Sequence, residues 1–166
     1  NLNNYKIKLF LILSMLSLSL PSSDYLWPTS ASKTLTTVFG DIRPFRYHTG
    51  IDIRTYGING HEVYAIQNGH ISRIVVSTSG YGKAIYIKMD DGNTSVYAHL
   101  DRFNDNLELI EKNLQKKCAC YSFDHTFENQ ELPIKRGEVI GYTGDTGSLS
   151  GPHLHFEIRN KKGKPF

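Results

Sequence analysis

Short stretches of alternating apolar and polar residues, separated by turn residues, dominate the chain between positions 62 and 99. Strands of about five to eight residues are predicted at Glu62–Ile66, His70–Ser77, Lys83–Met89 and Thr94–His99. Glycine-containing turns lie between them at Asn68-Gly69, Ser79–Gly82 and Asp90–Asn93. Asp91-Gly92 between two such strands is a strong hairpin signal.

A different period begins after these strands. Leu107, Ile110 and Leu114 are spaced by three and four residues, which predicts a short amphipathic helix over Asp105–Lys117 with Asn104 or Asp105 as its N-cap. Tyr121–Glu131 is polar and aromatic without a clear period, and we expect a loop or a weak hairpin there.

Strand character returns at Glu138–Thr143 and again at His153–Arg159. The close spacing of so many short strands favours a β-dominated fold, an antiparallel β-sheet sandwich or open barrel with one short helix.

The N-terminus has the pattern of a secretory leader. Lys6 and Lys8 precede an apolar run of 12 residues, Leu9–Leu20, and Pro21 and small residues follow. The run is too short to span a membrane comfortably. We therefore predict a signal peptide at 1–23, an extended lead-in at 24–37 and a folded domain at 38–166. Because no A-x-A site is present, an uncleaved signal anchor stays open, and either reading places the domain outside the cytoplasm.

Composition fits one globular domain, with 166 residues of which 39% are hydrophobic and 21% charged. The net charge of +3 falls to about +1 without the leader, and the basic pairs are scattered and lack an aromatic recognition motif. Nucleic acid is therefore not an expected partner. Because the chain starts at Asn1 and stops abruptly at Phe166, we expect a fragment, truncated at its C-terminus.

Two cysteines, Cys118 and Cys120, flank a single alanine. A disulfide across one residue would be strained, and a metal cluster with His125 is a further alternative. Two thiols in a variable loop are the expectation.

Five residues carry the candidate chemistry: His48, Asp52, His99, His153 and His155. On a strand, His153 and His155 point to the same side, while Leu154 faces the core. His48 and Asp52 are four residues apart, and Gly50 between them favours a turn or an irregular strand. Alone, each pair is compatible with surface histidines or a His–Asp hydrogen bond. Together, three of the five could hold a zinc ion with one coordination position open, as catalytic zinc sites do.

The chain resembles the lysostaphin/LytM-type zinc endopeptidases, which cut peptide cross-links in bacterial peptidoglycan. The resemblance runs from about Phe39 to Arg159. It is carried by seven ordered blocks, at Phe39–Arg43, His48–Asp52, Gly69–Ile71, Gly80–Gly82, Val96–Leu100, Gly144–Ser148 and Gly151–Glu157.

The resemblance implies a β-sheet groove with one Zn²⁺ per chain at its floor. By the same resemblance, His48, Asp52 and His155 match the metal ligands, and His99 and His153 match the catalytic histidines. The glycine-rich stretch Gly141–Gly151 lacks the lysine of a phosphate-binding loop, so we expect it to border the groove and deliver His153. Residues 105–133 are an insertion of unassigned role.

These observations predict an exported zinc endopeptidase that acts on peptidoglycan in the periplasm or cell envelope, with no membrane span after processing. One of the two catalytic histidines would accept a water proton and the other would stabilise the oxyanion. A non-catalytic wall-binding or hydrolase-activating domain of the same fold is the alternative, and a structural β-domain with incidental histidines is a third. A leader without a recognisable wall-binding module fits a periplasmic enzyme that acts on direct D-alanyl–diaminopimelate links, while glycine bridges and a protein substrate stay open. The sequence does not indicate the oligomeric state.

Overall fold

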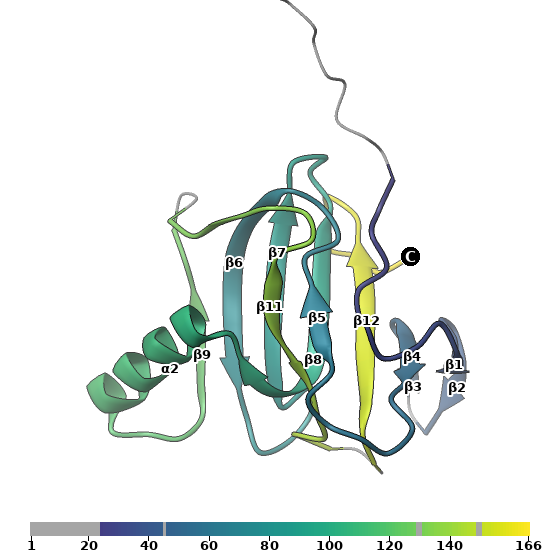
Figure 1. Ribbon diagram of the computed structural model, residues 1–166, viewed down its shortest axis with the longest axis horizontal. Coiled ribbons are helices and arrows are strands. Elements are labelled where there is room, and N and C mark those ends of the chain that lie inside the picture. The colour runs from purple at the N-terminus through teal and green to yellow at the C-terminus, as the bar shows by residue number, and fades with distance from the viewer. Residues whose placement is uncertain (1–23, 45, 129–130, 149–150) are drawn as a thin grey trace, which may run out of the picture.

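The computed structural model describes residues 24–44, 46–128, 131–148 and 151–166, so the predicted signal peptide at 1–23 lies outside the described residues. One helix and a set of mostly short strands make up this part of the chain (Figure 1). The elements are β1 (Leu35–Thr37), β2 (Ile42–Arg43), β3 (Arg46–Tyr47), β4 (Ile51–Arg54), β5 (Glu62–Tyr64), β6 (Gly69–Val76), β7 (Lys83–Met89), β8 (Thr94–Phe103), α2 (Asp105–Cys118), β9 (Phe123–Thr126), β10 (Pro133–Ile134), β11 (Val139–Thr143) and β12 (His153–Arg159).

The main sheet is antiparallel, in the order β1-β4-β12-β8-β7-β6-β10. β11 pairs with both β5 and β8, and β9 adds to β6. In Figure 1, β5 and β11 lie in front of β7 and β8, and residues of both layers share one hydrophobic core. The β-dominated antiparallel fold with one short helix is therefore confirmed among the described residues.

The two faces of the main sheet differ in character because side chains alternate along each strand. On β12, Leu154 and Phe156 enter the large core, as predicted. His153, His155 and Glu157 lie on the opposite face, beside a small second cluster of Ala84, Tyr86, Val96 and Ala98. One face of the sheet thus packs in the hydrophobic core, and the other presents polar side chains.

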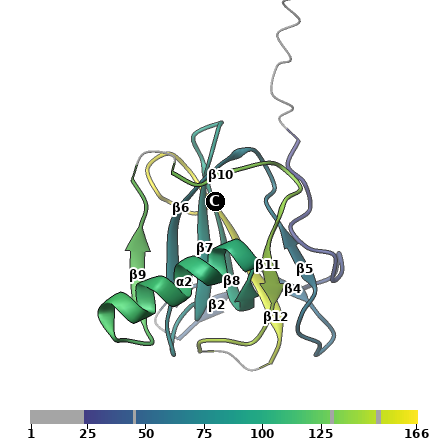
Figure 2. The ribbon, with the colours of Figure 1, turned by 60° about the vertical axis from the view of Figure 1, so that its left-hand side comes forward.

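The helix α2 matches its sequence signals. The Asn104 side chain caps it by accepting a hydrogen bond from the Leu107 backbone NH at 3.0 Å. Leu107 is buried, and Ile110 and Leu114 pack against the core, so the helix lies against the sheet (Figure 2). Within the described residues no helix has both the length and the apolar character needed to cross a membrane.

Two expectations for the segment after α2 were wrong. The segment predicted as a loop or weak hairpin contains β9, which pairs with the edge of β6. Cys118 and Cys120 form a disulfide rather than two thiols. The reason is that Ala119 adopts a left-handed conformation at the end of α2, with φ 50° and ψ 39°, which brings the two cysteine Cα atoms to 5.2 Å. That separation is within the ordinary range for a disulfide.

Replacing Leu154 with Ala tests whether β12 is anchored by its core face. Leu154 is fully buried between two histidines of the opposite face, so Leu154→Ala should lower the free energy of unfolding by about 2–5 kcal/mol. Urea titration measures the loss. Leu109→Ala on the exposed side of α2, where the side chain is 61% exposed, is the matched control and should change it by no more than about 0.5 kcal/mol. Equal losses in the two variants would contradict this packing.

Candidate metal centre

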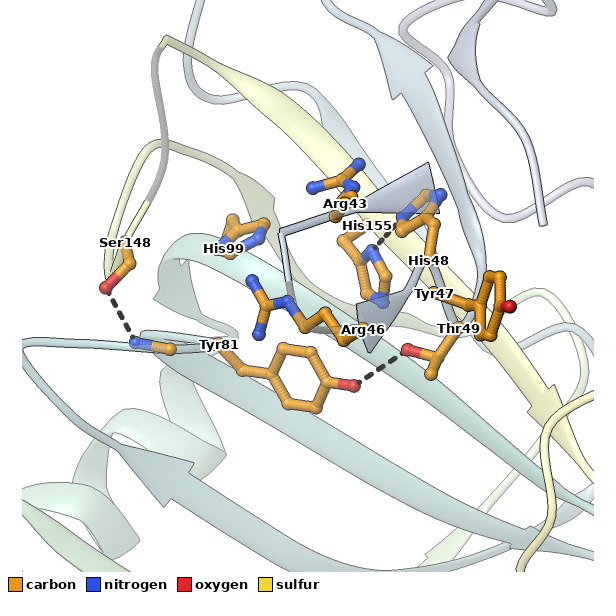
Figure 3. Close-up of a pocket in the computed structure, with 10 residues that line it drawn as sticks. Arg43, Arg46, Tyr47, His48, Thr49, Tyr81, His99, Ser148 and His155 are labelled. Carbon is orange, nitrogen blue, oxygen red and sulfur yellow. Dashed lines mark hydrogen bonds between the residues drawn. The ribbon is translucent and has the colours of Figure 1, made fainter. Parts of the chain in front are cut away.

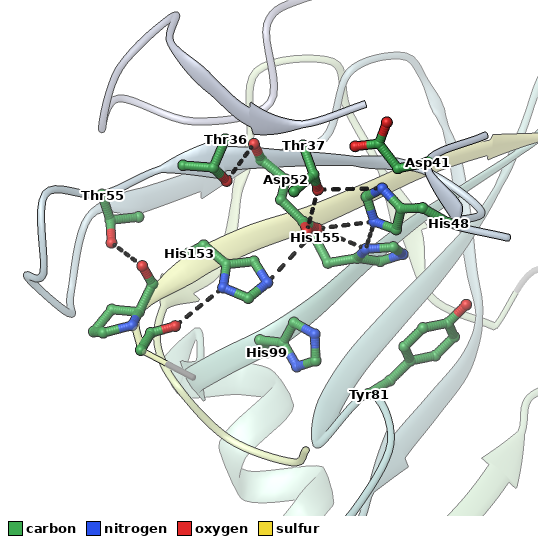
Figure 4. Close-up of polar contacts among 12 residues, drawn as sticks. Thr36, Thr37, Asp41, His48, Asp52, Thr55, Tyr81, His99, His153 and His155 are labelled. Atoms are coloured by element: carbon green, nitrogen blue, oxygen red, sulfur yellow. Dashed lines mark hydrogen bonds and ion pairs between the residues drawn. The ribbon is translucent and has the colours of Figure 1, made fainter. Parts of the chain in front are cut away.

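Three neighbouring strands bring the predicted site residues together. β12 lies between β4 and β8, and His155 on β12 is opposite Asp52 on β4 and Ala98 on β8. His99 follows Ala98, and His153 precedes His155 by two residues on the same face of β12. His48 comes from the loop between β3 and β4. All five predicted residues therefore lie in one region (Figure 4).

Gly50 allows the His48 loop to approach β12 closely. A Cβ atom at this position would lie 2.2 Å from the Phe156 carbonyl oxygen and 2.8 Å from Cγ of Glu157. Any side chain would therefore push the loop away from β12. The glycine predicted to mark a turn is needed for this close approach.

His48, Asp52 and His155 form a buried cluster of converging donor atoms. His48 Nε2 lies 3.1 Å from Asp52 Oδ1 and 3.0 Å from His155 Nδ1. His155 Nδ1 lies 2.9 Å from the same carboxylate oxygen. Each of the three residues is only 4% exposed, so little water screens the atoms from one another.

The chemistry of this donor set fits a zinc ion. Two imidazole nitrogens and one carboxylate oxygen are ligands that zinc binds at about 2.0–2.2 Å. At tetrahedral angles such ligands are about 3.3 Å apart, so the observed triangle has nearly the required size. Among the described residues, these three are the group of His, Cys, Asp and Glu side chains whose donor atoms converge in this way.

The outer atoms of the same side chains are held by hydrogen bonds that leave the inner atoms free. His48 Nδ1 donates to the Val38 carbonyl at 2.9 Å, which leaves the Nε2 lone pair facing the cluster. Asp52 Oδ2 accepts hydrogen bonds from Thr37 Oγ1 at 2.6 Å and from Arg43 Nη2 at 2.8 Å. Such outer contacts orient metal ligands and fix their tautomers.

Burial and hydrogen bonding set the protonation of the cluster. Burial alone would raise the pKa of Asp52, but hydrogen bonds from His155 and Thr37 hold that pKa well below its usual range. Burial would lower the pKa of His155, but Asp52 and Glu157 outweigh it and raise the pKa. The carboxylate is thus ionised and ready to bind a cation.

His99 lies in a β-bulge, and β8 continues past it to Phe103, so the expectation that the strand ends at His99 was wrong. Its φ of 60° is in the left-handed region, which is costly for a residue other than glycine. His99 Nδ1 donates to the Thr146 carbonyl at 2.9 Å, and burial lowers the pKa of the ring to about 4. His99 is therefore neutral near pH 7 and its Nε2 carries a lone pair.

His153 completes the group from the other side. Its Nδ1 donates to the Gly151 carbonyl at 3.0 Å, and its Nε2 lies 3.6 Å from Asp52 Oδ1. The rings of His99 and His153 are 4.9 Å apart, and the His153 side chain is 17% exposed. The two imidazoles thus stand next to each other beside the cluster.

Two cavities flank this group. One, of about 340 Å³, is lined by residues that include Arg46, Tyr47 and Tyr81 (Figure 3). The other, of about 570 Å³, is lined by residues that include Thr36, Asp52 and His153. Arg43, His99 and Ser148 line both. An extended ligand lying in both cavities would pass the cluster and the two histidines.

Several residues of the site were not singled out from the sequence. Thr37, Arg43 and Thr146 orient predicted residues, and no local pattern announces contacts between segments so far apart. Tyr81 stacks on His155 with ring centroids 5.2 Å apart, and in the sequence it stands only between the two glycines of the block Gly80–Gly82. Glu157 contacts His155, and its place two residues further along the same strand was a signal that could have found it.

Comparison with known proteins gives a family. A sequence profile described as Peptidase family M23 matches residues 46–115 and 119–166. The DD-carboxypeptidase/endopeptidase Mpg of Neisseria meningitidis serogroup B is 32% identical over 118 residues, which are 71% of this chain and 21% of that protein. Lysostaphin of Staphylococcus simulans is 30% identical over 112 residues, 66% of this chain and 17% of that protein. The chain thus matches only about a fifth of the length of these relatives.

Solved structures agree on the fold. A zinc-containing peptidase from Vibrio cholerae superimposes with a TM-score of 0.63 at 24% identity, over 89% of this chain and 39% of that one. LytU superimposes with a TM-score of 0.52 at 29% identity, over 75% of this chain and 72% of that one.

The amount of bound zinc in two variants tests which residues hold the metal. His155→Ala removes one converging donor, so we expect the variant to retain far less than one zinc per chain after desalting. His99→Asn should retain about one zinc per chain, because His99 is not in the cluster and asparagine tolerates a left-handed backbone. Elemental mass spectrometry measures both. Full zinc in His155→Ala would contradict the assignment.

The low pKa of His99 predicts a pH-dependent stability in metal-free protein. Because the pKa is lowered from 6.5 to about 4, the unfolded chain binds a proton in this range that the native state does not. The contribution of this ring to stability is therefore lost as the pH falls from 6.5 towards 4. Urea unfolding with chelator present should show wild type losing more stability than His99→Asn over this range. Parallel pH curves for the two proteins would contradict a buried neutral His99.

Proposed function

The chain belongs to peptidase family M23, and on that premise we propose that it is an exported zinc endopeptidase that hydrolyses peptide cross-links of bacterial peptidoglycan. The observation that carries the proposal is a buried three-donor cluster with two further imidazoles beside it. A three-ligand site with a free position is typical of catalytic zinc, whereas structural zinc sites are closed by four protein ligands.

In this proposal His48, Asp52 and His155 hold one zinc ion. A zinc ion held there would lower the pKa of a water molecule and polarise the carbonyl of the scissile amide. The outer atoms of the three ligands, His48 Nδ1, His155 Nε2 and Asp52 Oδ2, are engaged in hydrogen bonds to the protein. Each ligand therefore has one atom left to bind the ion.

His99 and His153 supply the proton chemistry. Both donate their Nδ1 hydrogens to backbone carbonyls, so both present Nε2 to the substrate. As neutral rings they are acceptors at Nε2, and either can take the proton of the attacking water. The other must be protonated to donate a hydrogen bond to the oxyanion. Placement of the two rings side by side allows both roles in one turnover.

The substrate proposal rests on the cavities and on the relatives. An extended peptide laid through both cavities would present one amide bond to the zinc and the two histidines. Mpg of N. meningitidis is named a DD-carboxypeptidase/endopeptidase. A further relative, 31% identical over 83 residues, is named the peptidoglycan DD-endopeptidase ShyB of V. cholerae. We therefore favour a direct D-alanyl–diaminopimelate link over a glycine bridge.

Export follows from the same proposal, because peptidoglycan lies outside the cytoplasmic membrane. The leader predicted at residues 1–23 would direct the chain there. After processing the enzyme would act in the periplasm or the cell envelope.

Digestion of purified sacculi tests this function. Residues 24–166 with zinc should release uncrosslinked muropeptides, whose masses identify the cleaved bond, and chelator should abolish the release. His99→Asn with bound zinc is the matched control, and its rate should fall at least about 100-fold, the usual contribution of a general acid or base. Intact sacculi despite one bound zinc per chain would contradict the proposal and favour the non-catalytic wall-binding alternative.

A further inference from the structure

Glu157 is a carboxylate removed entirely from water next to the cluster. Its side chain is 0% exposed, and it lies on β12 two residues after His155, on the same face of the sheet. Burying a charge in this way is costly unless the charge is fully paired and hydrogen-bonded. The carboxylate therefore needs a set of partners that repay its desolvation.

Four donors surround this carboxylate. Oε1 accepts hydrogen bonds from His155 Nε2 at 2.8 Å, from Thr49 Oγ1 at 2.6 Å and from the Tyr81 hydroxyl. Oε2 accepts from Arg159 Nε at 2.7 Å. Because every neighbour is a donor, the position requires a group that only accepts.

The contact with His155 determines which of its nitrogens can bind a metal. A neutral imidazole has one N–H and one lone pair. In the metal-free protein Nδ1 faces Asp52 with its hydrogen, and that hydrogen must leave before a metal can bind there. With the remaining hydrogen on Nε2 and donated to Glu157, the lone pair is on Nδ1, the atom that lies among the donors of His48 and Asp52. The Tyr81 ring stacks on the His155 ring with centroids 5.2 Å apart, and its hydroxyl donates to the same Glu157 oxygen.

Of the three cluster residues, only His155 has its outer atom hydrogen-bonded to a carboxylate. His48 is held by a backbone carbonyl and Asp52 by a hydroxyl and a guanidinium. A carboxylate behind a metal-bound histidine fixes the tautomer and raises the basicity of the ligand. The loop carrying His48 also packs on the Glu157 side chain, since a Cβ at Gly50 would lie 2.8 Å from Glu157 Cγ.

We propose that Glu157 is a positioning residue that sets the Nδ1-binding form and the orientation of His155, and so determines the affinity of the cluster for zinc. The inference rests on the proposed function, because it assumes that the cluster holds the metal. It adds a role for a residue that touches neither the metal donors of His48 and Asp52 nor the two cavities.

The test compares two substitutions of buried glutamates. Glu157→Gln keeps the shape but places an NH₂ group against donors. Glu111→Gln is the matched control, because Glu111 is 5% exposed and pairs with Lys83 at 3.1 Å, between α2 and β7 and outside the cluster. Competition of each folded protein with a chromophoric zinc chelator should show affinity about 10- to 100-fold weaker for Glu157→Gln. Affinity should stay within about threefold of wild type for Glu111→Gln.

A spectroscopic readout distinguishes positioning from general destabilisation. In zinc-loaded wild type, ¹⁵N-edited NMR should show the His155 Nε2–H proton far downfield and slow to exchange, as a hydrogen bond to a buried carboxylate requires. In Glu157→Gln the resonance should move upfield and exchange faster, and in Glu111→Gln it should not move.

Three outcomes would overturn the inference. The first is unchanged zinc affinity and an unchanged Nε2–H resonance in Glu157→Gln. The second is an equal loss of affinity in both variants, because that is a stability effect. The third is a wild-type protein that binds no zinc, which would remove the proposed function as well. The first two outcomes leave the proposed function standing, so the two failures are distinguishable.

Discussion

The site depends on β12, which pairs with a strand on each of its two edges. β12 is hydrogen-bonded to β4 and to β8, and this register sets Asp52 and Ala98 on either side of His155. A slip of one residue would turn His153 and His155 into the core and expose Leu154 and Phe156. The fully buried Leu154 makes such a slip costly, so the apolar face of β12 fixes the position of the polar one.

Two unusual backbone positions near β12 direct histidine side chains towards the cluster. Gly50 permits a close approach of the His48 loop, and His99 is held with a φ of 60° at a bulge of β8. Bulges re-aim a side chain out of the regular pleat, and strained residues persist where their surroundings determine them. Here the hydrogen bond from His99 to the Thr146 carbonyl keeps the ring directed at the cluster. Packing of the hydrophobic core in the rest of the sheet offsets the energetic cost of the left-handed backbone at His99.

Much of this could be predicted from the sequence, and the limits have physical causes. Period-two patterns located β7 and β12, and the i, i+3, i+4 pattern with an Asn104 cap located α2. The five site residues were chosen by ligand chemistry and family resemblance, and the structure brings them together. Strands β1 and β4 escaped prediction because they form by pairing with segments far away in the sequence. Strands β2 and β3 pair with each other, but at two residues each they are too short to show a period-two pattern. Ala119 and His99 adopt left-handed conformations that their residue types do not announce. These two positions explain the errors on the disulfide and on the end of β8.

We propose that three protein atoms hold one zinc ion and leave one coordination position open. A crystal structure of the zinc-loaded protein, with anomalous data at the zinc edge, tests this arrangement. We expect one peak per chain, about 2.0–2.2 Å from His48 Nε2, Asp52 Oδ1 and His155 Nδ1, with a non-protein fourth ligand facing His99 and His153. A peak elsewhere, or a fourth position filled by His153 Nε2, would contradict it.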